Sequence, residues 1–265
     1  MSDDGIELQA AADQLGVHYQ TAYKWVRSGQ LPAALVQGRY LISPTAVAAF
    51  AERRVRPRRP APRRPRTGFA ALSNRTFDQL VAGDERQLRK TVASLVDDGV
   101  PFTTVMQELL VPALRRIGEE WQAGRMPIAV EHQVAAIVER VIGGHHPTPR
   151  GRRRGTAVVA ALSNDRHALP TSMAAAALRE DNWHVHHLGA DLPGDELVRY
   201  CDETAVDLVV LTVTATEVNA YAERIAQRLA TGGVRTLVGH PGGTLAELQR
   251  RARDRRSDAA RTRSR

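Results

Sequence analysis

The 265-residue sequence is poor in cysteine, lysine and aromatic side chains. Its one cysteine, Cys201, excludes an intramolecular disulfide. Aromatic residues make up 5% of the chain, and of the 37 basic residues only Lys24 and Lys90 are lysines. No apolar run reaches the roughly 18 residues that cross a bilayer. The acidic start, MSDDGIELQ, lacks the apolar core of a signal peptide. We therefore expect a cytoplasmic protein without a membrane partner.

The net charge of +8 is unevenly distributed along the chain. Residues 53–66 hold eight arginines, residues 150–154 hold four, and residues 250–265 hold eight. These runs contain only two acidic residues, which leaves 17 basic residues against 27 acidic ones elsewhere. An acidic body with basic arms indicates either a polyanionic partner contacted by the arms or solvated spacers.

Four segments differ in pattern. Residues 1–52 form an ordered N-terminal unit, whereas residues 53–67 (RRVRPRRPAPRRPRT) predict an extended linker, because like charges repel and proline prevents regular structure. Residues 68–146 show the helical period four times, which is typical of a four-helix bundle. The four helices are expected over residues 69–82, 84–96, 102–121 and 128–142.

Residues 154–265 alternate apolar strands with helices, which predicts a doubly wound, flavodoxin-like parallel sheet. Strands are expected over residues 156–162, 183–188, 207–214 and 235–239, with helices over 169–180, 195–204 and 217–230 and from 244 onward. A ligand of such a sheet binds at the carboxyl ends of the strands. Polar loops follow three of these strands, over residues 163–167, 212–216 and 240–243.

Residues 6–52 carry the pattern of a helix-turn-helix, AADQLGVHYQTAYKWVRSGQLPA. Gly16 permits a tight turn before a second helix over residues 19–28, and residues 36–42 predict a hairpin that forms a small wing. A closing helix begins at Ser43-Pro44. The outward side of the second helix and the tip of the wing offer side chains that suit base edges and phosphates, namely Gln20, Thr21, Lys24, Arg27 and Arg39.

This pattern resembles the excisionase-like branch of the winged helix-turn-helix proteins related to the MerR family. The shared motifs are L-G-V, T-x-x-x-W-V-x-x-G-x-L-P and a Gly-Arg hairpin. The resemblance implies that residues 1–52 bind double-stranded DNA. A helical module that binds protein is the alternative for this unit. The arginine-rich segment that follows either adds phosphate contacts or is a solvated spacer.

A second motif begins just after the first strand of the C-terminal segment, as Asp165-x-His167-x-x-Pro170. Pro170 and Thr212 are separated by 41 residues, and Thr214 and Gly242 by 27. These intervals resemble the cobalamin-binding domain shared by methionine synthase and methylmalonyl-CoA mutase, with its pattern D-x-H-x-x-G, about 41 residues, S-x-L, about 26 to 28 residues, G-G. Pro170 replaces a glycine of that pattern, and Thr214 replaces its leucine.

The resemblance implies a role for each residue of the motif. His167 would be the lower axial ligand of cobalt, and Asp165 would hold the other ring nitrogen of that histidine. Thr212 and Thr214 occupy the S-x-L positions, and Gly242 and Gly243 would lie along the nucleotide tail of the cofactor. The family normally has a fifth strand after the two glycines. Only 22 residues follow Gly243, so we expect an edge strand to be missing.

The helical segment contains a third motif, in which Trp121 is followed by nine residues and then by Glu131-His132. This W-x9-E-H motif resembles the cap of CarH-type photoreceptors, which join a MerR-like DNA-binding domain to adenosylcobalamin. The resemblance implies that Trp121, Glu131 and His132 cover the upper face of the cofactor. In that family, light breaks the cobalt–carbon bond and a DNA-binding tetramer dissociates. Gln122 stands where the family has a histidine that binds cobalt after illumination.

Together the motifs predict a DNA-binding transcriptional regulator and not an enzyme. Cobalamin, in the form of adenosylcobalamin, would control its association into a dimer or tetramer and hence its affinity for DNA. Light and the level of cobalamin are both open as the signal. Two alternatives remain: a corrinoid protein that carries methyl groups, and a regulator whose sensory domain has lost its cofactor.

Overall fold

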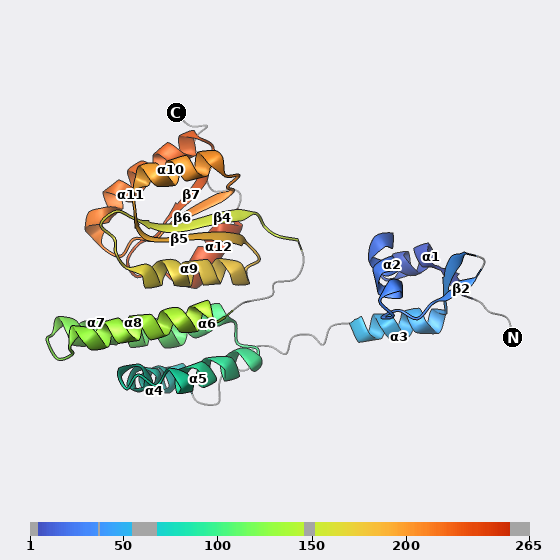
Figure 1. The fold of residues 1–265 in the computed structure, drawn as a ribbon, viewed down its shortest axis with the longest axis horizontal. Helices are drawn as coiled ribbons and strands as arrows, with labels where there is room; N and C mark the ends of the chain where they lie inside the picture. The colour runs from blue at the N-terminus through green and yellow to red at the C-terminus, as the bar shows by residue number, and fades with distance from the viewer. Residues whose placement is uncertain (1–4, 37, 55–67, 146–151, 255–265) are drawn as a thin grey trace. The chain divides into compact units, whose positions relative to one another are not determined.

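The computed structural model describes residues 5–36, 38–54, 68–145 and 152–254 (Figure 1). These residues form two compact units, one that ends with helix α3 and one that runs from helix α4 to helix α12. Residues 53 and 54 belong to α3, which ends at Arg54. The rest of the expected linker, residues 55–67, and the arginine-rich tail from residue 255 lie outside the described residues.

The N-terminal unit is a winged helix-turn-helix. Its elements are β1 (Ile6–Glu7), α1 (Leu8–Gln14), α2 (Tyr19–Arg27), β2 (Ala34–Val36), β3 (Arg39–Ile42) and α3 (Pro44–Arg54). Gly16, in the turn between α1 and α2, has a φ of +64°, a left-handed conformation that favours glycine. The expected hairpin, β2–β3, gains a third strand, because β1 pairs antiparallel with β3. A two-residue strand is too short to leave a periodic signal in the sequence.

The second unit begins with the helical bundle, which comprises α4 (Phe69–Val81), α5 (Glu85–Asp97), α6 (Phe102–Val105), η1 (Met106–Leu110), α7 (Val111–Gln122) and α8 (Ile128–Gly143). The third predicted helix is therefore interrupted by the π-helical turn η1. Pro112 accounts for the break, since it has no N–H to donate and its ring would clash with the carbonyl of Glu108 in a regular helix. None of the described helices is long and apolar enough to span a bilayer.

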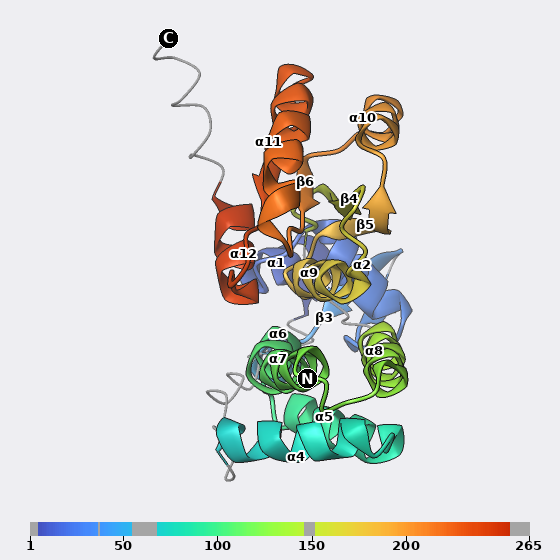
Figure 2. The same ribbon diagram turned by 90° about the vertical axis from the view of Figure 1, so that its left-hand side faces the viewer.

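The α/β domain has four parallel strands in the order β5-β4-β6-β7. Its elements are β4 (Thr156–Leu162), α9 (Ala168–Glu180), β5 (His184–Leu192), α10 (Gly194–Glu203), β6 (Leu208–Leu211), α11 (Thr216–Thr231), β7 (Arg235–Val238) and α12 (Leu245–Arg253). Helices α9 and α12 cover one face and α10 and α11 the other (Figures 1 and 2). Within residues 152–254 the sheet contains no fifth strand.

Two of the predicted strands end three or four residues away from the predicted position, and β7 ends one residue early, at Val238. β6 ends at Leu211 and not at Thr214, because the backbone N–H of Thr214 donates to the Asp165 carboxylate instead of continuing a ladder. β5 continues to Leu192, four residues beyond the predicted end. Shifts in the register between β4 and β5 allow this extension, with Gly189 at a φ of +80°.

The bundle packs against α9 of the α/β domain (Figure 1). Met173, Ala176 and Ala177 join the hydrophobic core of the bundle. Polar contacts add to this interface, since the Ser172 hydroxyl donates to Glu139 of α8 at 2.8 Å. The bundle and the sheet are therefore held together by one mixed interface, which fixes the bundle relative to the ends of the strands.

Glu180, at the end of α9, caps the first turn of α6. Its carboxylate accepts hydrogen bonds from the Phe102 N–H at 2.7 Å, the Thr103 N–H at 2.8 Å and the Thr103 hydroxyl at 2.6 Å.

We expect Glu180→Gln to lower the free energy of unfolding by about 1–3 kcal/mol, because one oxygen becomes an NH2 group that cannot accept these bonds. Urea denaturation measures the change. Glu203→Gln, at an exposed position on α10, is the control and should match the wild type.

A pH dependence of stability is expected from His187 on β5, whose Nε2 lies 2.7 Å from the Thr171 hydroxyl. Burial and the positive charge of Arg179 lower the pKa of His187 below 6.5, although Glu139 acts in the opposite direction. The unfolded chain therefore binds a proton at a higher pH than the folded chain does. The contribution of His187 to stability is present above 6.5 and is lost as the pH falls towards the folded pKa.

The measurement is urea denaturation at about pH 7.5 and about pH 5.5. His187→Gln should reduce the difference between the two free energies of unfolding by up to about 1 kcal/mol. His184→Gln, at an exposed position on the same strand, should keep the wild-type difference. An unchanged pH dependence in His187→Gln would contradict the assignment.

Candidate functional site

Three loops meet at the carboxyl ends of β4, β6 and β7, where a ligand of a parallel sheet binds. Asp165, in the loop after β4, is only 2% exposed. Its carboxylate accepts from the Thr214 N–H at 2.9 Å and from the Thr214 hydroxyl at 2.8 Å. Thr214 belongs to the loop after β6, so Asp165 joins the ends of two neighbouring strands.

His167 completes this cluster. Its Nδ1 lies 3.1 Å from Asp165 Oδ1 and 2.8 Å from Thr214 Oγ1. Burial alone would raise the pKa of Asp165, but hydrogen bonds from Thr214 and His167 outweigh it and lower that pKa. An ionised Asp165 favours a proton on Nδ1 of His167, which leaves Nε2 free as a ligand. The side chain of His167 is 70% exposed, so this nitrogen is accessible.

Thr214 makes a contact that the sequence pattern did not predict. Its side chain hydrogen-bonds the Asp165–His167 pair, where the family pattern has a leucine. Thr212, two residues earlier, differs. Its Oγ1 is buried and has no hydrogen-bond partner among the described residues. In the sequence, both threonines are recognisable only as hydroxyl side chains at the end of a strand. That signal does not distinguish the contact made by Thr214 from the buried position of Thr212.

Pro170 fits into the first turn of α9, the helix that follows His167. It is the third residue of that helix, where the backbone N–H would have no partner within the helix. His167 is the N-cap residue, with an extended backbone and a φ of −79°. The replacement of the family's glycine by Pro170 is therefore compatible with the local fold.

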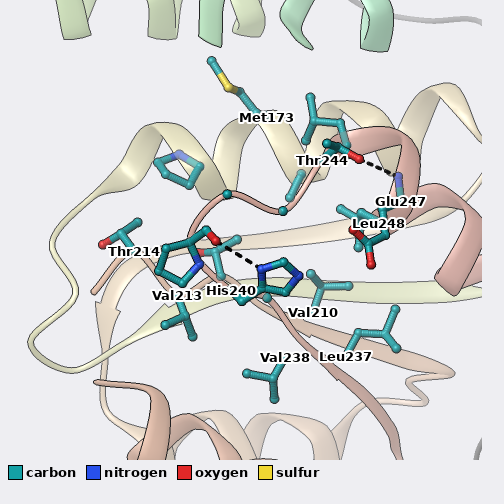
Figure 3. Close-up of a pocket in the computed structure, with 18 of the residues that line it drawn as sticks. Met173, Val210, Val213, Thr214, Leu237, Val238, His240, Thr244, Glu247 and Leu248 are labelled. Carbon is teal, nitrogen blue, oxygen red and sulfur yellow. Dashed lines mark hydrogen bonds between the residues drawn. The ribbon is translucent and has the colours of Figure 1, made fainter. Parts of the chain in front are cut away.

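A cavity of about 530 Å³ lies beside this cluster (Figure 3). Its floor is apolar and comes from the ends of β6 and β7, with Val210, Val213, Leu237 and Val238. Pro170, Met173, Leu248 and the loop with Gly242 and Gly243 form further parts of the wall. Gly242 has a φ of +85°, a conformation that favours glycine. The bundle contributes Gln107, Val111 and Arg115.

The three candidate cap residues lie where α7 meets α8. Trp121 is 41% exposed near the end of α7, and Glu131 and His132 belong to the first turns of α8. His132 Nε2 lies 3.7 Å from Glu131 Oε2. The α7–α8 connection and the loop before α9 are at the same end of the second unit (Figures 1 and 2). The helix ends that carry the cap residues therefore lie at the same end of this unit as the loop of His167.

The candidate DNA-binding side chains differ in exposure. Gln20, Lys24 and Arg27 are exposed on α2, whereas Thr21 is half-buried. Arg39 follows the turn of the wing and forms an ion pair with Glu7 of β1, with 2.6 Å between Nη1 and Oε1. A phosphate would have to compete with Glu7 for this arginine.

Sequence reasoning did not single out the exposed tyrosines of α2. Tyr19 and Tyr23 are 41% and 39% exposed, and their rings stack with centroids 6.3 Å apart. Their exposure on the same helix as Lys24 extends the surface that could meet DNA. The four-residue spacing of Tyr19 and Tyr23 indicates that both rings lie on one side of a helix. Tyrosines at that spacing are equally typical of a buried face, so the sequence did not reveal their exposure.

Comparison with family models defines the class of the chain. Residues 8–55 match the helix-turn-helix domain, residues 72–143 match one B12 binding domain and residues 155–260 match another. The protein therefore combines an N-terminal helix-turn-helix domain with a helical B12-binding cap and an α/β B12-binding domain.

Among curated proteins, the chain is distantly similar to the HTH-type transcriptional repressor CarH of Myxococcus xanthus. The two are 28% identical over 173 residues, which is 64% of this chain and 58% of the relative. Among solved structures, a monomethylamine corrinoid protein of Methanosarcina barkeri aligns with a TM-score of 0.56 and 14% identity, covering 69% of this chain and 97% of that one. At this identity the structural match shows a shared fold.

Proposed function

We propose that this protein is a cytoplasmic transcriptional regulator in which bound cobalamin controls DNA binding. The observation that carries the proposal is His167, held by Asp165 and Thr214 at the ends of the strands beside a ligand-sized cavity. The helix-turn-helix domain in the same chain supports an output on double-stranded DNA, and the similarity to the CarH repressor supports regulation.

The residues present fit a corrinoid. Thr212 Oγ1, which is buried and has no hydrogen-bond partner within the described part of the chain, lines the cavity and could donate to the base of a nucleotide tail. The apolar walls suit an aromatic base, and Gly242 and Gly243 leave the backbone accessible to it. Nε2 of His167 would bind cobalt, with Asp165 fixing the orientation of the ring. Adenosylcobalamin, the form we favour, supplies a cobalt–carbon bond that light can break.

The cap and the helix-turn-helix would convert the state of the cofactor into a change in DNA affinity. Trp121, Glu131 and His132 would cover the upper face and exclude water from it. The shape of the covered bundle would then determine whether copies of the chain associate as a dimer or tetramer. Joining several weak DNA-binding modules raises the overall affinity about 10²–10⁴-fold without any new contact to DNA.

The test is size-exclusion chromatography of protein reconstituted with adenosylcobalamin in the dark, repeated after illumination, with a gel shift on a pool of duplex DNA. We expect a corrinoid absorption spectrum in the protein peak, an oligomer in the dark, and loss of both the oligomer and the DNA complex in light. No bound corrinoid would instead support a cofactor-free sensory domain. Corrinoid binding without any DNA complex would support a methyl carrier.

A further inference from the structure

The helical bundle forms part of the wall of the cavity beside His167. A nucleotide-tail cavity formed by the α/β domain alone would be lined by the ends of β6 and β7 and by α9 and α12. Here the helical bundle also contributes Gln107 of η1 and Val111 and Arg115 of α7. Gln107 is fixed, because its Oε1 accepts a hydrogen bond at 3.0 Å from the Leu245 N–H, at the start of α12. The bundle is therefore docked directly onto the loop that follows Gly243.

The two arginines in the lining differ in what they contact. Arg251 donates through Nη1 to the Val238 carbonyl at 3.3 Å, so one of its donors is already used within the α/β domain. Arg115 has no hydrogen-bond or ion-pair partner anywhere in the part of the chain that the structure describes. Its neighbour Arg116 stacks over Phe77 at 3.8 Å and so has a structural role of its own. Arg115 is the cation of α7 that remains available to a ligand.

The charge of the lining suits one anionic group. Glu247 is the single acidic residue among the described residues of the lining, and its carboxylate lies 3.9 Å from Arg250 Nη2, a cation outside the cavity. Arg115 and Arg251 therefore leave an excess of positive charge in a wall that is largely apolar. A guanidinium group binds phosphate with two parallel hydrogen bonds, and such charge-assisted bonds are stronger than neutral ones.

We propose that Arg115 binds the phosphodiester of the corrinoid's nucleotide tail, so that the bundle contacts the lower end of the cofactor. This inference rests on the proposed function, because it requires a corrinoid in the cavity. A complete corrinoid carries one negative phosphodiester between its nucleotide and the corrin ring, whereas cobinamide lacks both nucleotide and phosphate. Arg115 thereby selects corrinoids with a complete tail, and the tail connects the bundle to the α/β domain.

Equilibrium binding of two probes, adenosylcobalamin and adenosylcobinamide, tests the assignment in the dark, with the absorption spectrum as the readout. In Arg115→Gln we expect about tenfold weaker binding of adenosylcobalamin and unchanged binding of adenosylcobinamide. Arg115→Lys should recover part of the loss, because it restores the charge but not the paired hydrogen bonds. Arg75→Gln, at an exposed position on α4 away from the cavity, is the matched control.

The outcomes separate this inference from the proposed function. If the wild type binds adenosylcobalamin and Arg115→Gln binds it equally well, the role of Arg115 is overturned and the proposed function stands. Equal weakening for both probes would also overturn it, since the residue would then act on the fold and not on the phosphate. If the wild type binds neither probe, the proposed function and this inference fail together.

Discussion

His167→Ala is expected to remove the nitrogen that we propose as the lower ligand of cobalt and to cause the largest change in cofactor binding. Nε2 of His167 is the accessible nitrogen of the cluster, and no second described histidine lies in contact with Asp165. We expect affinity for adenosylcobalamin to fall by about 100-fold or more, since loss of a ligand should exceed the 10–100-fold effect typical of its supporting partners. The spectrum of any cofactor that remains bound should change to that of a corrinoid without a lower nitrogen ligand.

Two further variants test whether the loss of binding is specific to His167 and the carboxylate that contacts it. Asp165→Asn should weaken binding by about 10–100-fold, because the amide loses the charge that holds Nδ1 of His167. His184→Ala, at an exposed position on β5, should leave both affinity and spectrum unchanged. A wild-type spectrum in His167→Ala, with tight binding, would remove His167 as the ligand.

Much of the fold could be predicted because it depends on local pattern. The continuous apolar run of residues 156–162 is the strand β4, with the predicted ends. Asp84 accepts a hydrogen bond from the Gln87 N–H as the N-cap of α5. The alternation of strands and helices led to the parallel sheet, since few topologies satisfy that order.

The remaining features depend on contacts between distant residues. Thr214 is 49 residues from Asp165, and nothing in either loop indicates that the two side chains meet. Glu180 caps α6 across 78 residues, so the cap is absent from the local sequence of that helix. Gln107 and Arg115 reach the cavity only because the bundle docks on α9. Such contacts depend on tertiary packing, which periodicity does not report.

The chain's two lysines permit a matched test of the DNA-binding surface. Lys24 is exposed on α2, and Lys90 is exposed on α5 of the bundle. We expect the double substitution Lys24→Ala and Arg27→Ala to remove about two phosphate contacts per module and to weaken DNA binding by about 10–100-fold. The slope of log affinity against log salt concentration should fall by about two per module. The measurement is a salt titration of binding to a duplex by fluorescence anisotropy.

The salt slope distinguishes a phosphate contact from a loss of folding. Misfolding of the helix-turn-helix would abolish binding at every salt concentration, whereas lost phosphate contacts leave a weaker complex with a shallower slope. Lys90→Ala should keep the wild-type affinity and slope, because its helix belongs to the bundle. If Lys90→Ala weakened binding as much as the α2 variant, the DNA surface would not be confined to the N-terminal unit. If the α2 variant kept its full slope, the phosphate contacts would have to come from other cations of the chain, such as the arginines of residues 53–66.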